Sequence, residues 1–235
     1  MSLKPFTFSK NTLKLAALSV LGLTITLSSC KLDSPEPVEI AALTIVNAAP
    51  KASAIDFYLD NQRVNNAEFN FGSQIDYQRV FPGARKATVK VGGKTDVWYE
   101  KNIKLNAGMY YSLYVIENLD SLAYVVTEDE YTKPADGSAK VRFINLSPDA
   151  PELTLVVDAD TTNFTRPYKL ATPFKNIKVE ANHKLTLKNK ATGADVATLD
   201  NVKLTSGRFY TFWAKGLLNT TETNKKIEIK ANKAM

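Results

Sequence analysis

The chain has 235 residues, of which 44% are hydrophobic and 23% are charged, and its formal net charge is +6. This composition is ordinary for globular proteins and does not favour a disordered chain. A single cysteine excludes a disulfide framework, so stability must come from apolar cores. No block of Lys and Arg residues follows the pattern of a phosphate-binding tract, so nucleic acid is not an expected partner.

The N-terminus has the features of an export signal. Three lysines precede an apolar run over residues 15–27, and no acidic residue occurs before Asp33. A positive start followed by a short apolar run is typical of a signal peptide. The run is shorter than the roughly 20 residues that a membrane-spanning helix needs. The sequence therefore predicts a cleaved signal over residues 1–29.

The apolar run ends in Leu27-Ser28-Ser29-Cys30, and Cys30 is the only cysteine of the chain. This ending resembles the lipobox of bacterial lipoproteins. The resemblance implies that Cys30 becomes the lipidated N-terminus of an outer-membrane lipoprotein, with the membrane as a partner through the lipid. Diacylglycerol plus an amide-linked acyl chain is enough for stable anchoring. The alternative is a free thiol that follows an ordinary signal.

Residues 30–41 are predicted to form a flexible tether. They include two prolines and three acidic residues, Asp33, Glu36 and Glu39, and this composition favours an extended, solvated chain. Acidic residues soon after the lipidated cysteine resemble a surface-export signal of lipoproteins in the Bacteroidota. Here they are scattered, so a periplasmic and a surface-exposed location both stay open. Cleavage of the signal removes three lysines and lowers the net charge to +3.

The rest of the chain contains an internal repeat. Residues 46–50, Val-Asn-Ala-Ala-Pro, match residues 144–148, Ile-Asn-Leu-Ser-Pro, at a shift of 98. Residues 102–114 match residues 201–213 at a shift of 99. A period of this size is that of a whole domain rather than of a solenoid unit. We therefore expect a first domain over residues 42–131, a linker over residues 132–138 and a second domain over residues 139–235.

Each copy reads as a series of short strands separated by turn residues. In the first copy we expect strands at residues 42–47, 55–60, 75–80, 86–91, 96–104, 109–117 and 122–127. In the second copy we expect strands at 140–145, 153–158, a loose pair within 167–179, 184–188, 195–204, 207–214 and 226–230. This spacing is typical of an immunoglobulin-like sandwich. The predicted fold class is all-β, with two tandem immunoglobulin-like β-sandwiches after the signal peptide.

A glycine and a tyrosine recur in both copies in the pattern Leu-x-x-Gly-x-x-Tyr. The glycine suits a turn that needs positive φ, and the tyrosine comes just inside the following strand. This arrangement resembles the tyrosine corner of β-sandwiches, in which the ring packs in the core and the hydroxyl bonds to the turn backbone. Tyr111 and Tyr210 are therefore predicted to be structural.

Two stretches carry a resemblance to a known family. Residues 46–50 and residues 142–151, Arg-Phe-Ile-Asn-Leu-Ser-Pro-Asp-Ala-Pro, each precede an alternating strand. They resemble the domain of unknown function family 4397, which occurs in exported bacterial proteins, and the resemblance implies an immunoglobulin-like fold. It is strongest over residues 140–158, is weaker over residues 42–60 and extends to about residue 215. In the first copy Lys51 and Ala52 replace the Asp-Ala of the second. No catalytic residues are implied.

Strand alternation gives the main candidates for ligand binding. If Tyr111 and Tyr210 point into their cores, the neighbouring residues of each strand point outward. The outward aromatic residues are Tyr110 and Tyr114 in the first copy and Phe209 and Trp213 in the second. Such rings can stack on sugars or anchor a protein partner. The alternative is that they are buried in a cross-strand cluster or between the two domains.

Other chemistry-bearing residues favour structural interpretations. His183 reads as a solvated turn residue, and no Gly-x-Ser-x-Gly motif accompanies it. Residues 158–163 offer alternating oxygen ligands but lack the glycine and the glutamate of a calcium loop. Glu128-Asp129-Glu130 reads as a solvated acidic edge. We therefore predict no catalytic residues, no metal site and no cofactor.

These features favour a non-enzymatic lipoprotein of the cell envelope. The expected function is binding or adhesion, with a glycan or an envelope protein as the partner. The alternative is a structural spacer or assembly component without a specific ligand. A hydrolase is the third possibility, and it would need a cleft that the motifs do not indicate.

Overall fold

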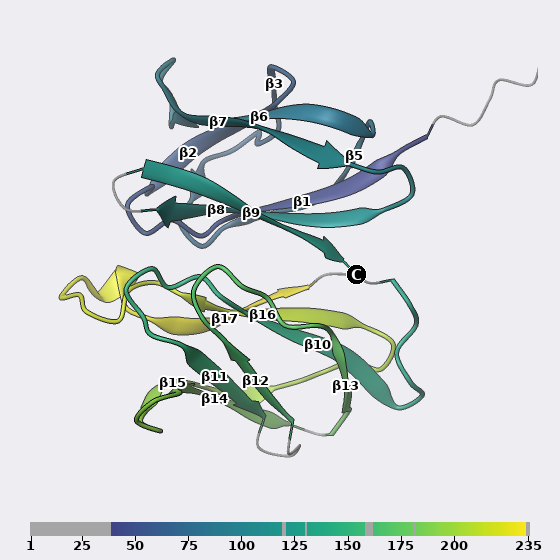
Figure 1. Ribbon diagram of the computed structural model, residues 1–235, viewed down its shortest axis with the longest axis vertical. Coiled ribbons are helices and arrows are strands. Elements are labelled where there is room, and N and C mark those ends of the chain that lie inside the picture. The colour runs from purple at the N-terminus through teal and green to yellow at the C-terminus, as the bar shows by residue number, and fades with distance from the viewer. Residues whose placement is uncertain (1–38, 119–120, 130, 158–161, 181, 234–235) are drawn as a thin grey trace, which may run out of the picture. The chain divides into compact units, whose positions relative to one another are not determined.

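The structure is a computed structural model that describes residues 39–233 except 119–120, 130, 158–161 and 181 (Figure 1). Residues 39–235 form one compact unit. In the described part of the chain the regular structure is β-strand, apart from one short 3-10 turn at Thr223–Lys225. The predicted all-β class is confirmed. The predicted signal over residues 1–29 and Cys30 lie outside the described residues.

No helix among the residues that the structure describes has the length and apolar character needed to cross a membrane.

The N-terminal half consists of two sheets that pack around one core (Figure 1). The first sheet has the order β5-β1-β8-β9, from strands β5 (Gln74–Val80), β1 (Ala41–Asn47), β8 (Tyr110–Asn118) and β9 (Ser121–Asp129). The second has the order β3-β2-β6-β7, from strands β3 (Gln62–Arg63), β2 (Ala54–Leu59), β6 (Gly83–Val91) and β7 (Val97–Leu105), with β4 (Phe69–Asn70) beside β2. Leu43, Phe57, Val89 and Leu113 are fully buried between the sheets, because alternate residues of each strand face inward.

The C-terminal half has the same organisation. Its first sheet has the order β13-β10-β16-β17, from strands β13 (Lys175–Lys178), β10 (Ser138–Asn145), β16 (Phe209–Lys215) and β17 (Glu228–Lys233). Its second has the order β12-β11-β14-β15, from strands β12 (Asn163–Arg166), β11 (Leu153–Val157), β14 (His183–Asn189) and β15 (Asp195–Val202). Val141, Phe143, Leu155 and Leu187 are fully buried in this second core.

The strand order repeats from one half to the other. β1 runs parallel to β8, and β10 runs parallel to β16. In immunoglobulin constant domains the first two strands lie in one sheet, whereas here β1 and β2 lie in different sheets, as do β10 and β11. The halves thus share the two-sheet architecture of immunoglobulin domains but differ from the constant type in strand order. The exact boundaries of two separate domains, including a linker over residues 132–138, stay a prediction.

Both predicted corner tyrosines lie at the start of a strand with their rings buried. The Tyr111 hydroxyl accepts a hydrogen bond from the backbone N–H of Asn106 at 3.2 Å. The Tyr210 hydroxyl accepts one from the backbone N–H of Thr205 at 3.1 Å. Each bond ties a strand to the turn before it, which is the contact expected of a tyrosine corner. Gly108, in the first of these turns, has a φ of 74°, a conformation that glycine adopts without steric cost.

A third apolar cluster joins the two halves. It is built from the outward-facing residues of β1 and β8 on one side and of β10 and β16 on the other. Tyr114 is 1% exposed and Trp213 is 0% exposed, and they lie in this cluster with Val46 and Ile144. The indole N–H of Trp213 donates a hydrogen bond to Asn232 at 3.2 Å. The outer face of one sheet in each half is therefore buried against the other half.

A buried ion pair crosses the same interface. The Arg142 guanidinium lies 2.5 Å from the Asp129 carboxylate, and both side chains are almost completely buried. Arg142 also donates to the Thr211 hydroxyl at 2.8 Å, while Ser112 donates to Asp129 at 2.7 Å. Burial and the Asp129 carboxylate raise the pKa of Tyr77, so its phenol stays protonated and donates to Asp129 at 2.5 Å. Asp129 is not part of a solvated acidic edge, as we had expected, because this network holds it in the interface.

Candidate functional site

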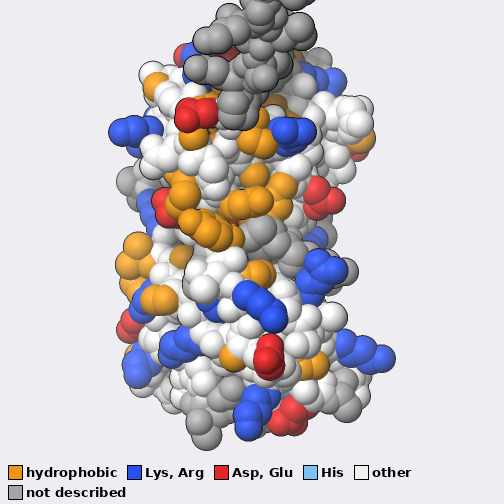
Figure 2. Space-filling model, turned by 90° about the vertical axis from the view of Figure 1, so that its right-hand side faces the viewer, with side chains coloured by type: hydrophobic (Ala, Val, Ile, Leu, Met, Phe, Trp, Pro, Cys, Tyr) orange, Lys and Arg blue, Asp and Glu red, His pale blue; other side chains and the backbone are white. Residues whose placement is uncertain are grey.

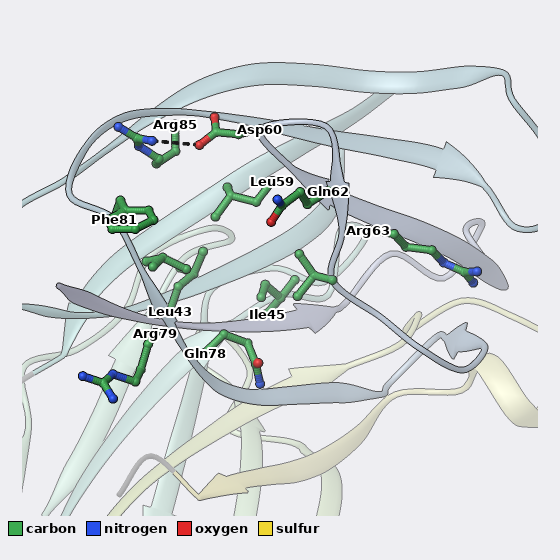
Figure 3. A pocket seen from close by; sticks show the side chains of 12 residues that line it. Leu43, Ile45, Leu59, Asp60, Gln62, Arg63, Gln78, Arg79, Phe81 and Arg85 are labelled. Carbon is green, nitrogen blue, oxygen red and sulfur yellow. Dashed lines mark hydrogen bonds and ion pairs between the residues drawn. The ribbon is translucent and has the colours of Figure 1, made fainter.

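An open cleft of about 400 Å³ lies in the N-terminal half, between the edges of its two sheets (Figure 3). One wall comes from β1 and the edge strand β5, and the other from β2, the edge strand β3 and the start of β6. Neither β5 nor β3 has a further strand beside it in its sheet, so the cleft opens along the edge of the sandwich. The lining residues are Leu43, Ile45, Leu59, Asp60, Gln62, Arg63, Val64, Gln78, Arg79, Val80, Phe81 and Arg85.

The lining is mainly aliphatic, with one aromatic residue at the mouth. Leu43 and Ile45 belong to the buried core, whereas Leu59, Val64 and Val80 are only partly buried and pack against it. Phe81 directly follows β5 and is 63% exposed. An exposed phenylalanine beside accessible aliphatic groups is apolar surface that a ligand would remove from water.

A tight hairpin turn positions the polar side of the cleft. Leu59 pairs with Gln62, so Asp60 and Asn61 form a two-residue connection between β2 and β3. Their φ values are 49° and 70°, which correspond to the type I′ turn favoured in such hairpins. The turn brings Gln62 over the cleft, where Figure 3 shows it beside Leu59. Gln78 comes from β5 on the opposite wall.

Two of the three arginines at the cleft already have carboxylate partners. Arg85 lies 2.9 Å from Asp60, and Arg63 lies 2.5 Å from Asp56. Arg79 is exposed, and its guanidinium points away from the Arg85–Asp60 pair in Figure 3. The cleft is therefore an apolar surface with amide groups on both walls, and among the described residues Arg79 at its rim has no ion pair.

Asp56 is held in its charged form. Burial by itself would raise its pKa, but hydrogen bonds from Asn65 and from the Gly93 backbone, together with the Arg63 guanidinium, lower the pKa below its usual value of 3.8. Asn65 also donates to the backbone oxygen of Ala67 at 2.8 Å and accepts from the Phe57 amide at 2.8 Å. The carboxylate thus anchors Arg63 and the chain that follows β3, which closes one side of the cleft.

Acid should weaken the fold through Asp56. Because its folded pKa is depressed, its contribution to stability is fully present above its unfolded pKa near 4 and is lost as the pH falls through the folded pKa. We expect the difference in free energy of unfolding between the wild type and Asp56→Asn to narrow below pH 4. Urea denaturation from pH 6 to pH 2 measures this difference. Asp136→Asn, at an exposed carboxylate, is the control, and a difference that stays constant over this range would contradict the prediction.

The four aromatic residues that we predicted to contact a ligand lie in different environments in the structure. Tyr114 and Trp213 are buried between the halves, so a ligand cannot reach them in this arrangement. Phe209 is 6% exposed and packs edge-to-face on Phe174. Tyr110 is partly buried. The alternative we considered, burial between the halves, describes Tyr114 and Trp213, because the outward face of each strand meets the opposite half rather than solvent.

Tyr110 lies in a group of three tyrosines. Its ring packs edge-to-face on Tyr77 at 5.7 Å and contacts Tyr131 at 6.3 Å between ring centroids. Tyr131 is 59% exposed, so part of this group faces solvent. Figure 2 shows one face of the molecule on which apolar side chains gather across the middle. The exposed large apolar residues of the described part are Phe81, Val97, Trp98, Val126, Tyr131 and Leu170.

His183 is not the solvated turn residue that we expected. It is the first residue of β14 and is 2% exposed, because strand parity turns it inward with Leu185 and Leu187. Neither ring nitrogen has a hydrogen-bond partner within the described part of the chain. Residues 158–161 of the oxygen-rich segment lie outside that part. Among the residues that the structure describes, no three His, Cys, Asp or Glu side chains come together as a metal site.

Sequence reasoning did not single out the cleft residues. Phe81 directly follows the strand that we expected over residues 75–80, and an aromatic residue at the end of a strand is a signal that could have pointed to an exposed ring. Leu59 and Val80 read as ordinary strand residues. Nothing local distinguishes a core position from one at an open sheet edge, since both fit the same alternation.

The two halves differ at the base of the cleft. In the N-terminal half the backbone N–H of Val64 donates to Phe57, and Val64 is partly exposed. In the C-terminal half Leu155, which corresponds to Phe57 at the shift of 98, pairs with Phe164, and Phe164 is 1% exposed. A buried phenylalanine thus occupies the place beside β11 that a smaller valine occupies beside β2.

One known family matches the part of the chain that contains the cleft. Residues 41–156 match the family model of DUF4397, a domain of unknown function. This segment belongs to the DUF4397 family. The DUF4397 match begins at β1 and ends in β11, so it continues past the segment that we predicted as a linker. It includes the whole cleft and the ion pair between Asp129 and Arg142.

Two further comparisons give no functional information. No curated protein matches the chain. Among solved structures, CBMbc (family CBM26) from Eubacterium rectale Amy13K, in complex with maltoheptaose, is similar at 9% identity and a TM-score of 0.24. The alignment covers 83% of this chain and 97% of that chain. A similarity of this size carries no inference about the ligand of this DUF4397 protein.

Proposed function

We propose that this protein is a non-enzymatic binding protein of the bacterial cell envelope, anchored to the outer membrane by lipid on Cys30, that takes a partner in the cleft of its N-terminal half. The observation that carries the proposal is the cleft itself. Its volume of about 400 Å³ lies within the range of about 300–1,000 Å³ usual for binding pockets. Its apolar lining with a few polar groups also fits a binding site.

The chemistry of the cleft favours a protein partner over a glycan. A sugar ring needs a flat aromatic platform with hydrogen-bonding groups around it, and the cleft has one ring, Phe81, beside five aliphatic side chains. Two of the aromatic residues that we predicted as ligand contacts, Tyr114 and Trp213, are buried. Apolar side chains of a protein segment would cover Phe81, Leu59 and Val80 and remove them from water. An envelope protein is therefore the partner class that we propose.

Photo-crosslinking in intact cells tests the proposal. A benzoylphenylalanine in place of Phe81 should form an adduct with one envelope protein, while the same group in place of Leu170 should not. Leu170 is a matched control, because it is 53% exposed and lies in the C-terminal half. Adding Leu59→Trp, which fills the cleft, should remove the adduct. The proposal is wrong if no adduct forms at position 81 or if the adduct is insensitive to Leu59→Trp.

The second candidate function is a structural spacer. The observation that favours it is the buried interface of apolar residues and one ion pair, which joins the halves into one body. A spacer needs this interface but does not need the cleft. If Leu59→Trp abolishes the function of the protein in cells, the result favours a binding protein. If the variant with the filled cleft keeps full function, the result favours a structural spacer.

A further inference from the structure

We infer that the partner docks as an extended segment that adds a strand to the free edge of β5, with alternate apolar side chains directed into the mouth of the cleft. The inference rests on the proposed function, since it names the form in which the partner occupies the same cleft. Strand addition is a common mode of peptide recognition, in which main-chain bonds provide affinity and pockets select alternate side chains.

The first observation is the position of β5. In the described part of the chain β5 pairs only with β1, so it is the outer strand of its sheet. It is seven residues long, and Asp76, Gln78 and Arg79 on it are exposed. An outer strand presents N–H and C=O groups on one side that lack a strand partner, and these can bond to an added chain. The other outer strand beside the cleft, β3, has only two residues.

The second observation is the register of β5. Val80 pairs with Ala41 and Gln78 pairs with Leu43, and both partners are buried in the core. Paired residues in a sheet point to the same face, so Val80 and Gln78 face the opposite sheet. A strand added beside Gln78 and Val80 continues this pleat, as far as the register shift of the β1–β5 pair between Leu43 and Ile45. Every second side chain of the partner would therefore point toward the cleft, over Leu59 and Val64 on the far wall.

The third observation is the charge at one end of β5. Arg63 and Arg85 are each paired with an aspartate, whereas Arg79 has no hydrogen bond or ion pair among the described residues. Figure 3 shows the Arg79 guanidinium extended at the rim. A carboxylate on the partner beside Arg79 would pair with this guanidinium. The partner segment is thus a strand of alternating apolar residues with an acidic residue at one end.

Synthetic peptides can test strand addition directly. The probe is fluorescein-labelled Thr-Val-Thr-Val-Thr-Val-Glu, mixed with the full chain in phosphatidylcholine vesicles and measured by co-sedimentation. Two derivatives carry N-methyl groups, one on the amides of the valines and the other on the amides of the threonines. Only one edge of an added strand bonds to β5. One derivative should therefore lose binding by at least about ten-fold, and the other should bind nearly as well as the probe.

Protein variants locate the site of the added strand. Leu59→Trp should abolish binding of the probe, and Arg79→Ala should weaken it by about three-fold, the effect of one exposed ion pair. A probe with Gln in place of Glu should not distinguish Arg79→Ala from the wild type. Arg208→Ala, at an exposed arginine in the C-terminal half, is the control and should bind like the wild type.

The outcomes separate this inference from the proposed function. Equal effects of both N-methyl patterns, or no binding of the probe, would overturn strand addition, while an adduct at position 81 would still support a protein partner. Binding of dodecanoate or of a soluble oligosaccharide in the cleft without binding of the peptide would also overturn it. Absence of both the adduct and peptide binding would overturn the two proposals together.

Discussion

Replacing Arg142 by alanine is expected to lower the free energy of unfolding by about 3–5 kcal/mol, because it leaves the Asp129 carboxylate buried without a counter-charge. Both side chains of this pair are nearly inaccessible to water, and their charged atoms are 2.5 Å apart. Arg142 also bonds to Thr211 and lies over the ring of Phe174 at 4.6 Å. The change therefore removes contacts to both halves at once.

Urea denaturation followed by circular dichroism measures this loss. Arg208→Ala, at an exposed arginine, is the control and should change the free energy of unfolding by less than about 0.5 kcal/mol. The double variant Arg142→Met with Asp129→Leu should be more stable than Arg142→Ala, because it removes both charges from the interface. If Arg142→Ala and Arg208→Ala lower the free energy of unfolding by the same amount, the ion pair between Arg142 and Asp129 does not stabilise the fold.

Trp213→Ala should have a similar effect through lost packing. Trp213 is fully buried in the cluster between the halves, and its indole N–H bonds to Asn232. Removing a buried tryptophan side chain typically costs about 3–5 kcal/mol, because the lost contacts and the remaining cavity both destabilise the fold. We therefore expect a loss of stability in Trp213→Ala rather than a selective loss of binding.

The chain provides its own control, since Trp98 is its other tryptophan and is 37% exposed. Trp98→Ala should cost about 1 kcal/mol or less. Denaturation monitored by far-ultraviolet circular dichroism compares the two variants without depending on tryptophan fluorescence. A Trp213→Ala variant as stable as Trp98→Ala would show that the interface between the halves contributes little and would reopen the interpretation of Trp213 as a ligand contact.

Most of the longer strands could be predicted from the sequence. β1, β2 and β5 begin or end within a residue of the expected positions, because in each of them a short run that contains apolar residues lies between turn signals. The short strands β3, β4 and β12 were missed as separate elements. Two to four residues are too few for a periodic pattern, so such strands form only because a neighbouring strand offers them main-chain partners.

Much less of the candidate site could be predicted from the sequence. Its residues come from β1, β2, β3, β5 and the start of β6, and nothing in the sequence says that two sheet edges separate at this place. The predictions of solvent exposure for His183 and Asp129 were wrong for a related reason. Both were interpreted from polar neighbours along the chain, whereas strand parity and the opposite half decide their burial.

Strand parity in β8 and β16 follows from the sequence alone, because side chains alternate between faces in any extended chain. Tyr111 and Tyr210 lie in the cores as their parity requires, and Tyr114 and Trp213 lie on the opposite faces. Strand parity does not show whether an outer face contacts solvent or another part of the protein. Only the tertiary structure decided that these faces meet each other and exclude water, while the open edge beside β5 leaves Phe81 and its aliphatic neighbours accessible. The physical reason is that burial depends on contacts between segments about 100 residues apart, and local patterns do not encode such contacts.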